Sequence, residues 1–118
     1  MKRKMFHAKI HRARVTDADL DYEGSVTIGS NLLESSGIRP FERVQVVNVD
    51  NGERLETYVI EGEENEICLN GAAARRCRIG DKVIVIAYGV YEDGEDMEPR
   101  VVHVNKDNEV VSVDVVEF

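Results

Sequence analysis

The chain has 118 residues, of which 42% are hydrophobic and 32% are charged. This length and composition indicate one folded domain over residues 1–118 and argue against a disordered chain. The net charge of −8 argues against general nucleic-acid binding, which needs clustered positive charge, and no segment approaches the ~20 apolar residues of a membrane-spanning helix.

The first predicted element is a strand over residues 4–15, where the side chains alternate with a period of two. This period places Lys9 and His11 on the same face of the strand. A second, shorter β-like run covers residues 25–28. The basic start of the chain therefore lies within a patterned strand rather than in a loose tail.

A helix is predicted next, followed by a hairpin. The helix should begin at Ser30, whose hydroxyl can cap free backbone N–H groups, and end at Gly37. Two strands over residues 43–50 and 53–61 flank an Asn-Gly pair at residues 51–52. This pair predicts a type I′ turn, in which both central residues have positive φ.

The remaining elements are short, and most of them are strands. We expect a strand, a helical turn, a longer strand and a final hairpin at residues 67–69, 71–76, 82–90, and 101–104 with 110–116. Many short strands separated by turns indicate a mainly β barrel or sandwich. Periodicity alone does not choose between these two architectures.

Cysteine usage and size suggest where the protein works. Cys68 and Cys77 occur in a chain without an evident signal peptide, so we expect free thiols and a cytoplasmic location. A domain of this size buries only about two-thirds of its unfolded surface, which favours self-association. Acidic runs in residues 61–66 and 92–98 are interpreted as solvated loops.

Metal chemistry is not expected. His7 and His11 are four residues apart, but the sequence between them is not the H-E-x-x-H of a zinc protease. Neither cysteine lies at zinc-ligand spacing from a histidine. His7 and His103 are interpreted as structural residues.

The Gly24-Ser25 pair gains meaning from its surroundings. Alone it would be an ordinary turn entering a strand. It lies in Ala18-Asp-Leu-Asp-Tyr-Glu-Gly-Ser25, after Lys9-Ile-His-Arg-Ala-Arg-Val-Thr16 and before Asn51-Gly-Glu-Arg-Leu-Glu-Thr-Tyr58 and Leu69-Asn-Gly-Ala-Ala-Ala74. With these four blocks, in this order, the chain resembles the bacterial aspartate 1-decarboxylases over roughly residues 1–91.

The resemblance implies a fold, an activity and an assembly. The family fold is a small six-stranded double-psi β-barrel with short helices, and its members form homotetramers with active sites between subunits. They convert L-aspartate to β-alanine and carbon dioxide for pantothenate and coenzyme A synthesis. The chain would cut itself between Gly24 and Ser25, giving residues 1–24 and 25–118, and Ser25 would become a covalently bound pyruvoyl group. Neither a metal nor pyridoxal phosphate would be needed.

The chemistry explains the residues near the cut. Ser25 would attack the Gly24 carbonyl, and a serine hydroxyl is a weak nucleophile that needs favourable geometry. Gly24 would allow a strained backbone without a Cβ clash. Thr57 is the family's candidate donor to the developing oxyanion and also a substrate contact.

Decarboxylation calls for further groups. The substrate amine would form a Schiff base with the pyruvoyl group at residue 25, and Tyr58 would return a proton to the substrate carbon. The two carboxylates of aspartate need cations, and Arg54 and Lys9 are the candidates. Substrate would also lie against the backbone of Gly71, Ala72 and Ala73. Supporting roles are expected for His11, Tyr22 and Asn70.

Each of these residues has an ordinary alternative. A strand tyrosine such as Tyr58 usually packs, an arginine after a hairpin such as Arg54 is usually a surface charge, and residues 72–74 would normally form a plain helical turn. His11 could be a half-buried structural histidine. Two departures from the family pattern stand out: Val47 replaces an aromatic residue common in relatives, and the acidic segment after Tyr91 matches less closely.

Two other functions stay open. The chain could be a pyruvoyl decarboxylase of another amino acid, although paired cations favour a diacid. It could also be a non-enzymatic double-psi barrel that stays uncut and binds an anionic partner through Lys9 and Arg54. The sequence does not decide whether cleavage is spontaneous or needs a maturation factor.

Overall fold

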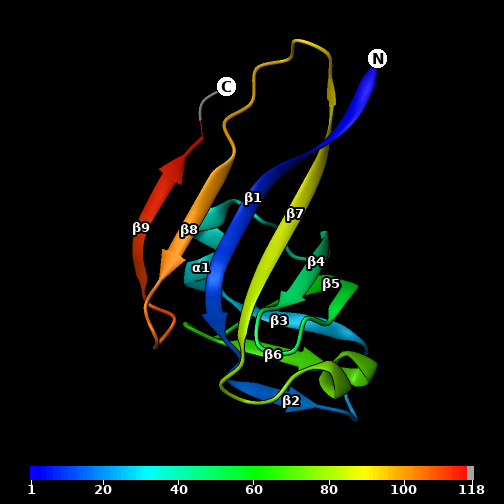
Figure 1. The fold of residues 1–118 in the computed structure, drawn as a ribbon, viewed down its shortest axis with the longest axis vertical. Coiled ribbons are helices and arrows are strands. Elements are labelled where there is room, and N and C mark those ends of the chain that lie inside the picture. Colours follow the sequence, from blue (N-terminus) through cyan, green and yellow to red (C-terminus); the bar gives the residue numbers. More distant parts are fainter. Residues whose placement is uncertain (117–118) are drawn as a thin grey trace.

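The computed structural model describes residues 1–116 and is mainly β (Figure 1). Nine strands, one α-helix and one 3₁₀ helix follow in the order β1 (Lys2–Arg14), β2 (Asp17–Asp19), β3 (Ser25–Gly29), α1 (Ser30–Ser36), β4 (Arg43–Asn48), β5 (Arg54–Gly62), β6 (Ile67–Asn70), η1 (Gly71–Arg76), β7 (Lys82–Glu92), β8 (Arg100–Val104) and β9 (Val110–Val115). The mainly β class expected from the sequence is confirmed.

The strands form one continuous order, β2-β6-β3-β5-β4-β7-β1-β8-β9. Its middle six strands run from β6 to β1, and the two ends of this set meet at Thr16 and Ile67. The backbone N–H and the hydroxyl of Thr16 both donate to the Ile67 carbonyl, at 2.8 and 3.0 Å. This contact curls the six strands toward a small barrel, with β3 and β6 crossing the lower end of β1 and β7 in Figure 1. Residues 1–116 therefore contain nine strands where six were expected, because β2, β8 and β9 extend the order at its two ends.

β1 changes its inward face part-way along its length. Ala8 and Ile10 are fully buried, whereas Lys9 and His11 are half-buried on the opposite face. Arg12 has a φ of 61°, and the register against β7 shifts between Ile10 and Ala13. Such a β-bulge reverses the alternation, which buries Ala13. The shared face predicted for Lys9 and His11 is confirmed.

Two local predictions need correction. α1 begins at Ser30, but its start has no side-chain cap; its end at Gly37, with a φ of 79°, is as expected. The β4–β5 connection has positive φ at Gly52 but not at Asn51, so it is not a type I′ turn. The Asn48 side chain instead accepts the Asp50 N–H at 2.9 Å, which organises a longer loop.

The core lies between the barrel strands and α1. Its fully buried large side chains are contributed by β1, β3, β4, β5, β6, β7, α1 and the residue after β1: Ile10, Val15, Val26, Ile28, Leu32, Val44, Val46, Val59, Ile67, Leu69, Val83 and Val85. At about 25 cal/mol per Å² of apolar surface, this burial is the main force that fixes the strand register. None of the helices in residues 1–116 is long and apolar enough to cross a membrane.

Candidate active site

A cavity of about 570 Å³ lies where three segments meet: the loop before β3, the first half of β5, and η1. Its lining residues are Gly24, Arg54, Leu55, Glu56, Thr57, Tyr58, Ala72, Ala73 and Arg76. The fold therefore brings together six of the residues singled out from the sequence, which come from three positions far apart in the chain: Gly24, Arg54, Thr57, Tyr58, Ala72 and Ala73. We call this space the β5–η1 cavity.

Pairing with β4 holds the β5 residues in place. Val47 lies opposite Arg54, and Arg43 lies opposite Tyr58. The Arg54 guanidinium donates to Gln45 Oε1 at 3.4 Å, and the Tyr88 hydroxyl donates to the same oxygen at 3.0 Å. Val47 does not line the cavity. The difference from the family pattern at this position can therefore affect the cavity only through its cross-strand partner, Arg54.

The β5–η1 cavity favours an anionic ligand. Arg54 and Arg76 both line it, and the only lining carboxylate, Glu56, is ion-paired with Arg43. Arg76 donates to Glu53 at 2.8 Å and to the Arg54 carbonyl at 3.3 Å, which ties η1 to the start of β5. Sequence reasoning missed Arg76 and Gln45. The Arg-Arg pair that ends the small-residue run at 71–74 was the available signal for Arg76.

Ser25 is fully buried next to this cavity. Antiparallel pairing of β3 with β6 places it opposite Asn70. The Asn70 amide donates to Ser25 Oγ at 3.0 Å and to Thr27 Oγ1 at 2.9 Å, while the Ser25 hydroxyl donates to the Glu23 carbonyl at 2.8 Å. The hydroxyl is thus fixed by a donor and an acceptor, one residue away from the cavity lining.

Near the Gly24-Ser25 bond, the position that has no room for a side chain is Gly71, not Gly24. Gly71 has a φ of +65°, and a Cβ there would lie 2.8 Å from Gly24 Cα and 2.9 Å from Gly24 N. A Cβ on Gly24 would meet nothing within 4 Å, and Gly24 is not among the positive-φ residues. The backbone strain expected at Gly24 is therefore not observed; the close approach is made by η1.

Six predicted residues are outside the lining of the β5–η1 cavity in the same chain: Ser25, Asn70 and Gly71, described above, and Lys9, His11 and Tyr22. The Lys9 ammonium lies 4.7 Å from the centre of the Phe6 ring. The His11 ring packs edge-on to His103 at 5.5 Å, and Tyr22 is 54% exposed. Burial, followed by the charges of His103, Arg12 and Lys9, lowers the pKa of His11 below its ordinary value.

The other two histidines and both cysteines lie outside the β5–η1 cavity. His7 pairs with Glu42, and His103 lies 3.0 Å from Asp114. Cys68 and Cys77 are free thiols, as expected. Across residues 1–116, no group of three or more His, Cys, Asp or Glu side chains is placed to hold a metal ion.

Comparison with known proteins gives a consistent result. The model of the family described as aspartate decarboxylase matches residues 1–111, well past residue 91, where the resemblance seen in the sequence ends. An aspartate 1-decarboxylase of Salinibacter ruber is 57% identical over 93% of this chain and 78% of its own length. Aspartate 1-decarboxylases of Kosmotoga olearia and Thermoanaerobacter pseudethanolicus are 55% and 50% identical, over 94% and 96% of this chain and 98% and 100% of their own lengths.

Proposed function

The chain belongs to the aspartate decarboxylase family, and we propose that it converts L-aspartate to β-alanine and carbon dioxide after cutting itself between Gly24 and Ser25. The observation that carries this proposal is one cavity that holds Arg54, Arg76, Thr57 and Tyr58 together with Gly24. The product would supply pantothenate and coenzyme A synthesis, a cytoplasmic role.

The proposed cleavage begins with Ser25. Its Oγ attacks the Gly24 carbonyl carbon as the C–N bond breaks, which moves the acyl group from nitrogen to oxygen. The Asn70 amide, 3.0 Å from Oγ, orients the nucleophile, and Thr57 is the proposed donor to the developing oxyanion. β-Elimination then breaks the new ester bond and releases the Gly24 carboxylate. Water then hydrolyses residue 25, whose nitrogen leaves as ammonia, and the pyruvoyl group remains. Residues 1–24 and 25–118 become separate chains.

The surroundings of Ser25 fit a pyruvoyl group. The residue is sealed from solvent on the β3–β6 pair, and Gly71 provides the close backbone approach that a Cβ would block. A pyruvoyl group formed there would supply, through its adjacent amide carbonyl, the sink for the electrons left when carbon dioxide departs.

The residues of the cavity have separate tasks in decarboxylation. Arg54 offers a planar fork for one substrate carboxylate, and Arg76 adds positive charge at the same wall. The Tyr58 phenol is the proposed proton donor to the substrate carbon. Gly71, Ala72 and Ala73 leave the backbone of η1 open to close contact with the substrate.

In this proposal, Lys9 and His11 can take part in the site only through contact with a second copy of the chain. Both occupy the outward face of β1, and neither lines the β5–η1 cavity of its own chain. We propose that assembly as a homotetramer brings Lys9, with His11 and Tyr22 in supporting positions, to the cavity of a neighbouring copy. The site would then hold one cation for each carboxylate of aspartate.

Intact mass under denaturing conditions tests the proposal first. We expect chains 1–24 and 25–118, the second lighter by one ammonia than a chain that starts with serine. Ser25→Ala should stay whole and inactive. Decarboxylation by that variant would contradict the mechanism. If the wild-type chain stays uncut after heating and after incubation with a maturation factor, a binding module is the better explanation.

Substrate choice is tested separately. Aspartate should turn over faster than glutamate and neutral amino acids, because the cavity is built around two arginines. Preference for another amino acid would retain the pyruvoyl mechanism but reject aspartate as the substrate.

A further inference from the structure

A second cleft, of about 400 Å³, lies at the far end of β1 and shares no lining residue with the β5–η1 cavity. Its lining is almost entirely basic: His11, Arg12, Arg14, Lys82, His103, Val104, Asn105 and Lys106. These residues come from the end of β1, the start of β7, the end of β8 and the turn that follows. We call this space the β1–β8 cleft.

The strand register places like charges side by side in the β1–β8 cleft. Arg14 is the cross-strand partner of Lys82 on β7, and His11 is the partner of His103 on β8. Directly opposed like charges destabilise a sheet. A chain with 23 acidic and 15 basic residues nevertheless gathers four arginine or lysine side chains here, so a compensating anion is the simplest physical account.

Among residues 1–116, Asp114 is the one carboxylate that pairs with a lining residue of the cleft, His103. No carboxylate lines the cleft, and within residues 1–116 the side chains of Arg12, Arg14, Lys82 and Lys106 form no salt bridge. Arg14 donates to the Gly80 carbonyl at 3.2 Å, a neutral partner. Burial, and then the charges of His103, Arg12 and Lys9, lower the pKa of His11. The contribution of these charges indicates a positive electrostatic potential at the His11 ring.

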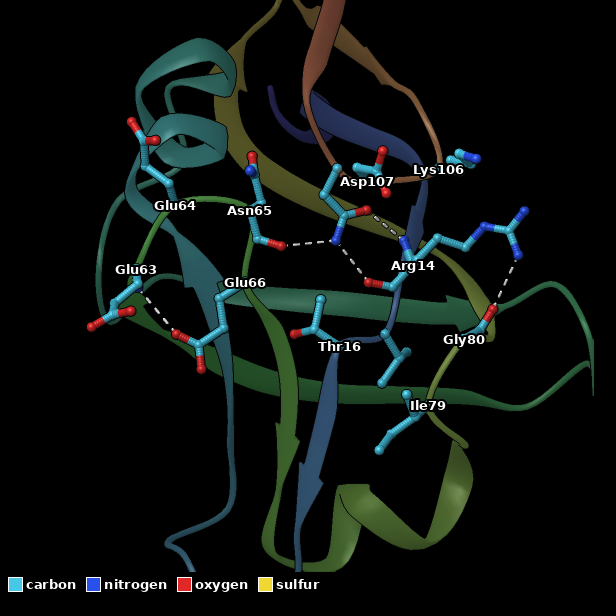
Figure 2. A pocket seen from close by; sticks show the side chains of 12 residues that line it. Arg14, Thr16, Glu63, Glu64, Asn65, Glu66, Ile79, Gly80, Lys106 and Asp107 are labelled. Atoms are coloured by element: carbon cyan, nitrogen blue, oxygen red, sulfur yellow. Dashed lines mark hydrogen bonds between the residues drawn. The ribbon is translucent and has the colours of Figure 1, made fainter.

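The basic turn is fixed in place before any ligand arrives. Asn108, fully buried and with a φ of 60°, donates to the carbonyls of Arg14 and Asn65 at 2.8 and 2.9 Å and accepts the Arg14 N–H at 2.7 Å. This pins the turn that carries Lys106 to the end of β1. Figure 2, a view of the neighbouring cavity, shows Arg14, Lys106 and Asp107 on one side and Glu63, Glu64 and Glu66 on the other.

We propose that the β1–β8 cleft binds a compact oxyanion with two or more negative charges, of the phosphate, diphosphate or phosphate-ester class. Arginine forks match phosphate oxygens in pairs, and Lys82 and Lys106 add point charges from the opposite strand and the turn. Two charges or more are required because a monoanion would leave most of the cations uncompensated. The proposal rests on Arg12, Arg14, Lys82 and Lys106, none of which is assigned to the decarboxylase site, so it does not depend on that function.

Calorimetric titration of the full-length protein in phosphate-free buffer tests this site. The probes are phosphate, diphosphate and ADP, with succinate as a dicarboxylate probe and chloride as a monovalent one. We expect one diphosphate per chain, weaker binding of phosphate, and affinity that falls as salt rises. ADP matching diphosphate identifies a phosphate ester as the ligand source, whereas diphosphate alone identifies an inorganic anion.

The double variant Arg12→Gln/Lys106→Gln should weaken diphosphate binding at least tenfold while its thermal unfolding midpoint stays near wild type. The matched control Lys2→Gln/Arg75→Gln removes the same charge elsewhere and should bind as wild type does. Three results would overturn the proposal: no diphosphate binding, equal loss in both double variants, or succinate binding that Arg12→Gln/Lys106→Gln weakens as much as it weakens diphosphate binding. Succinate binding that this double variant leaves unchanged belongs to the β5–η1 cavity.

Discussion

Gly71 and Gly24 touch so closely that the contact admits no side chain on Gly71, whose Cβ would lie 2.8 Å from Gly24 Cα. The two residues belong to η1 and to the loop before β3, which meet only because β6 pairs with β3. The bond at which we propose cleavage is therefore positioned by a residue from another segment of the chain.

Gly71→Ala should slow self-cleavage on the order of 10²-fold, because the clash displaces the Gly24 carbonyl from Ser25 Oγ. It should also cost about 1–2 kcal/mol in the free energy of unfolding, since Ala is strained at positive φ. The time course of the two fragments on a denaturing gel measures the rate. Gly52→Ala is the control: its φ is +76°, but a Cβ there meets nothing within 4 Å. Equal cleavage in both variants would contradict the role of Gly71.

Asn70→Ala should also delay cleavage, because Ser25 Oγ loses the donor at 3.0 Å. The buried groups left unpaired should destabilise the fold by about 1–3 kcal/mol. Thr27→Val is the matched control, since it removes the other acceptor of the same amide and leaves Ser25 untouched. If Thr27→Val cleaves as slowly as Asn70→Ala, the effect belongs to strand packing and not to the nucleophile.

Tyr58→Phe should cut normally and then lose turnover by about 10²–10⁴-fold, the usual contribution of a general acid. Thr57→Val should show the opposite pattern, with slow cleavage, because Thr57 is the proposed oxyanion donor. Fragment masses and β-alanine formation per processed chain separate the two steps. Full turnover in Tyr58→Phe would remove that residue from the proton-donor role.

Gln45→Leu should raise KM for aspartate about fivefold and leave kcat and self-cleavage near wild type. The Gln45 carbonyl oxygen accepts from both Arg54 and Tyr88, and losing one such hydrogen bond is worth about 1 kcal/mol. Gln45→Glu retains an acceptor and should bind aspartate better than Gln45→Leu does. A fall in kcat with unchanged KM would instead place Gln45 in the chemical step.

Both thiols should react slowly with iodoacetamide while the chain is folded. Burial, followed by nearby carboxylates, raises the pKa of Cys68 and of Cys77 to about 11. At pH 8 the reactive thiolate is then on the order of one part in a thousand, and it increases only as pH rises toward 11. Mass spectrometry with and without denaturant measures the two rates. Equal rates in both conditions would show that neither thiol is protected.

The sequence by itself determined the parts that depend on neighbouring residues. Alternation predicted the face shared by Lys9 and His11, Gly37 ended α1, and the helical turn predicted at 71–76 is η1. The motif blocks identified Gly24, Ser25, Thr57 and Tyr58 as candidates. The three-residue strand β2 was missed because it is too short to show a period.

Tertiary structure decided which of these residues meet. Ser25 and Asn70 are 45 residues apart. Arg54 and Tyr88 both reach Gln45 only through the register of β4 with β5 and β7. The bulge at Arg12 and the pinned turn at Asn108 gather the cations of the β1–β8 cleft. A local sequence pattern indicates the face of a strand on which a side chain lies. The register between distant strands is set instead by burial of the common core. Only the folded chain therefore shows which faces enclose a site.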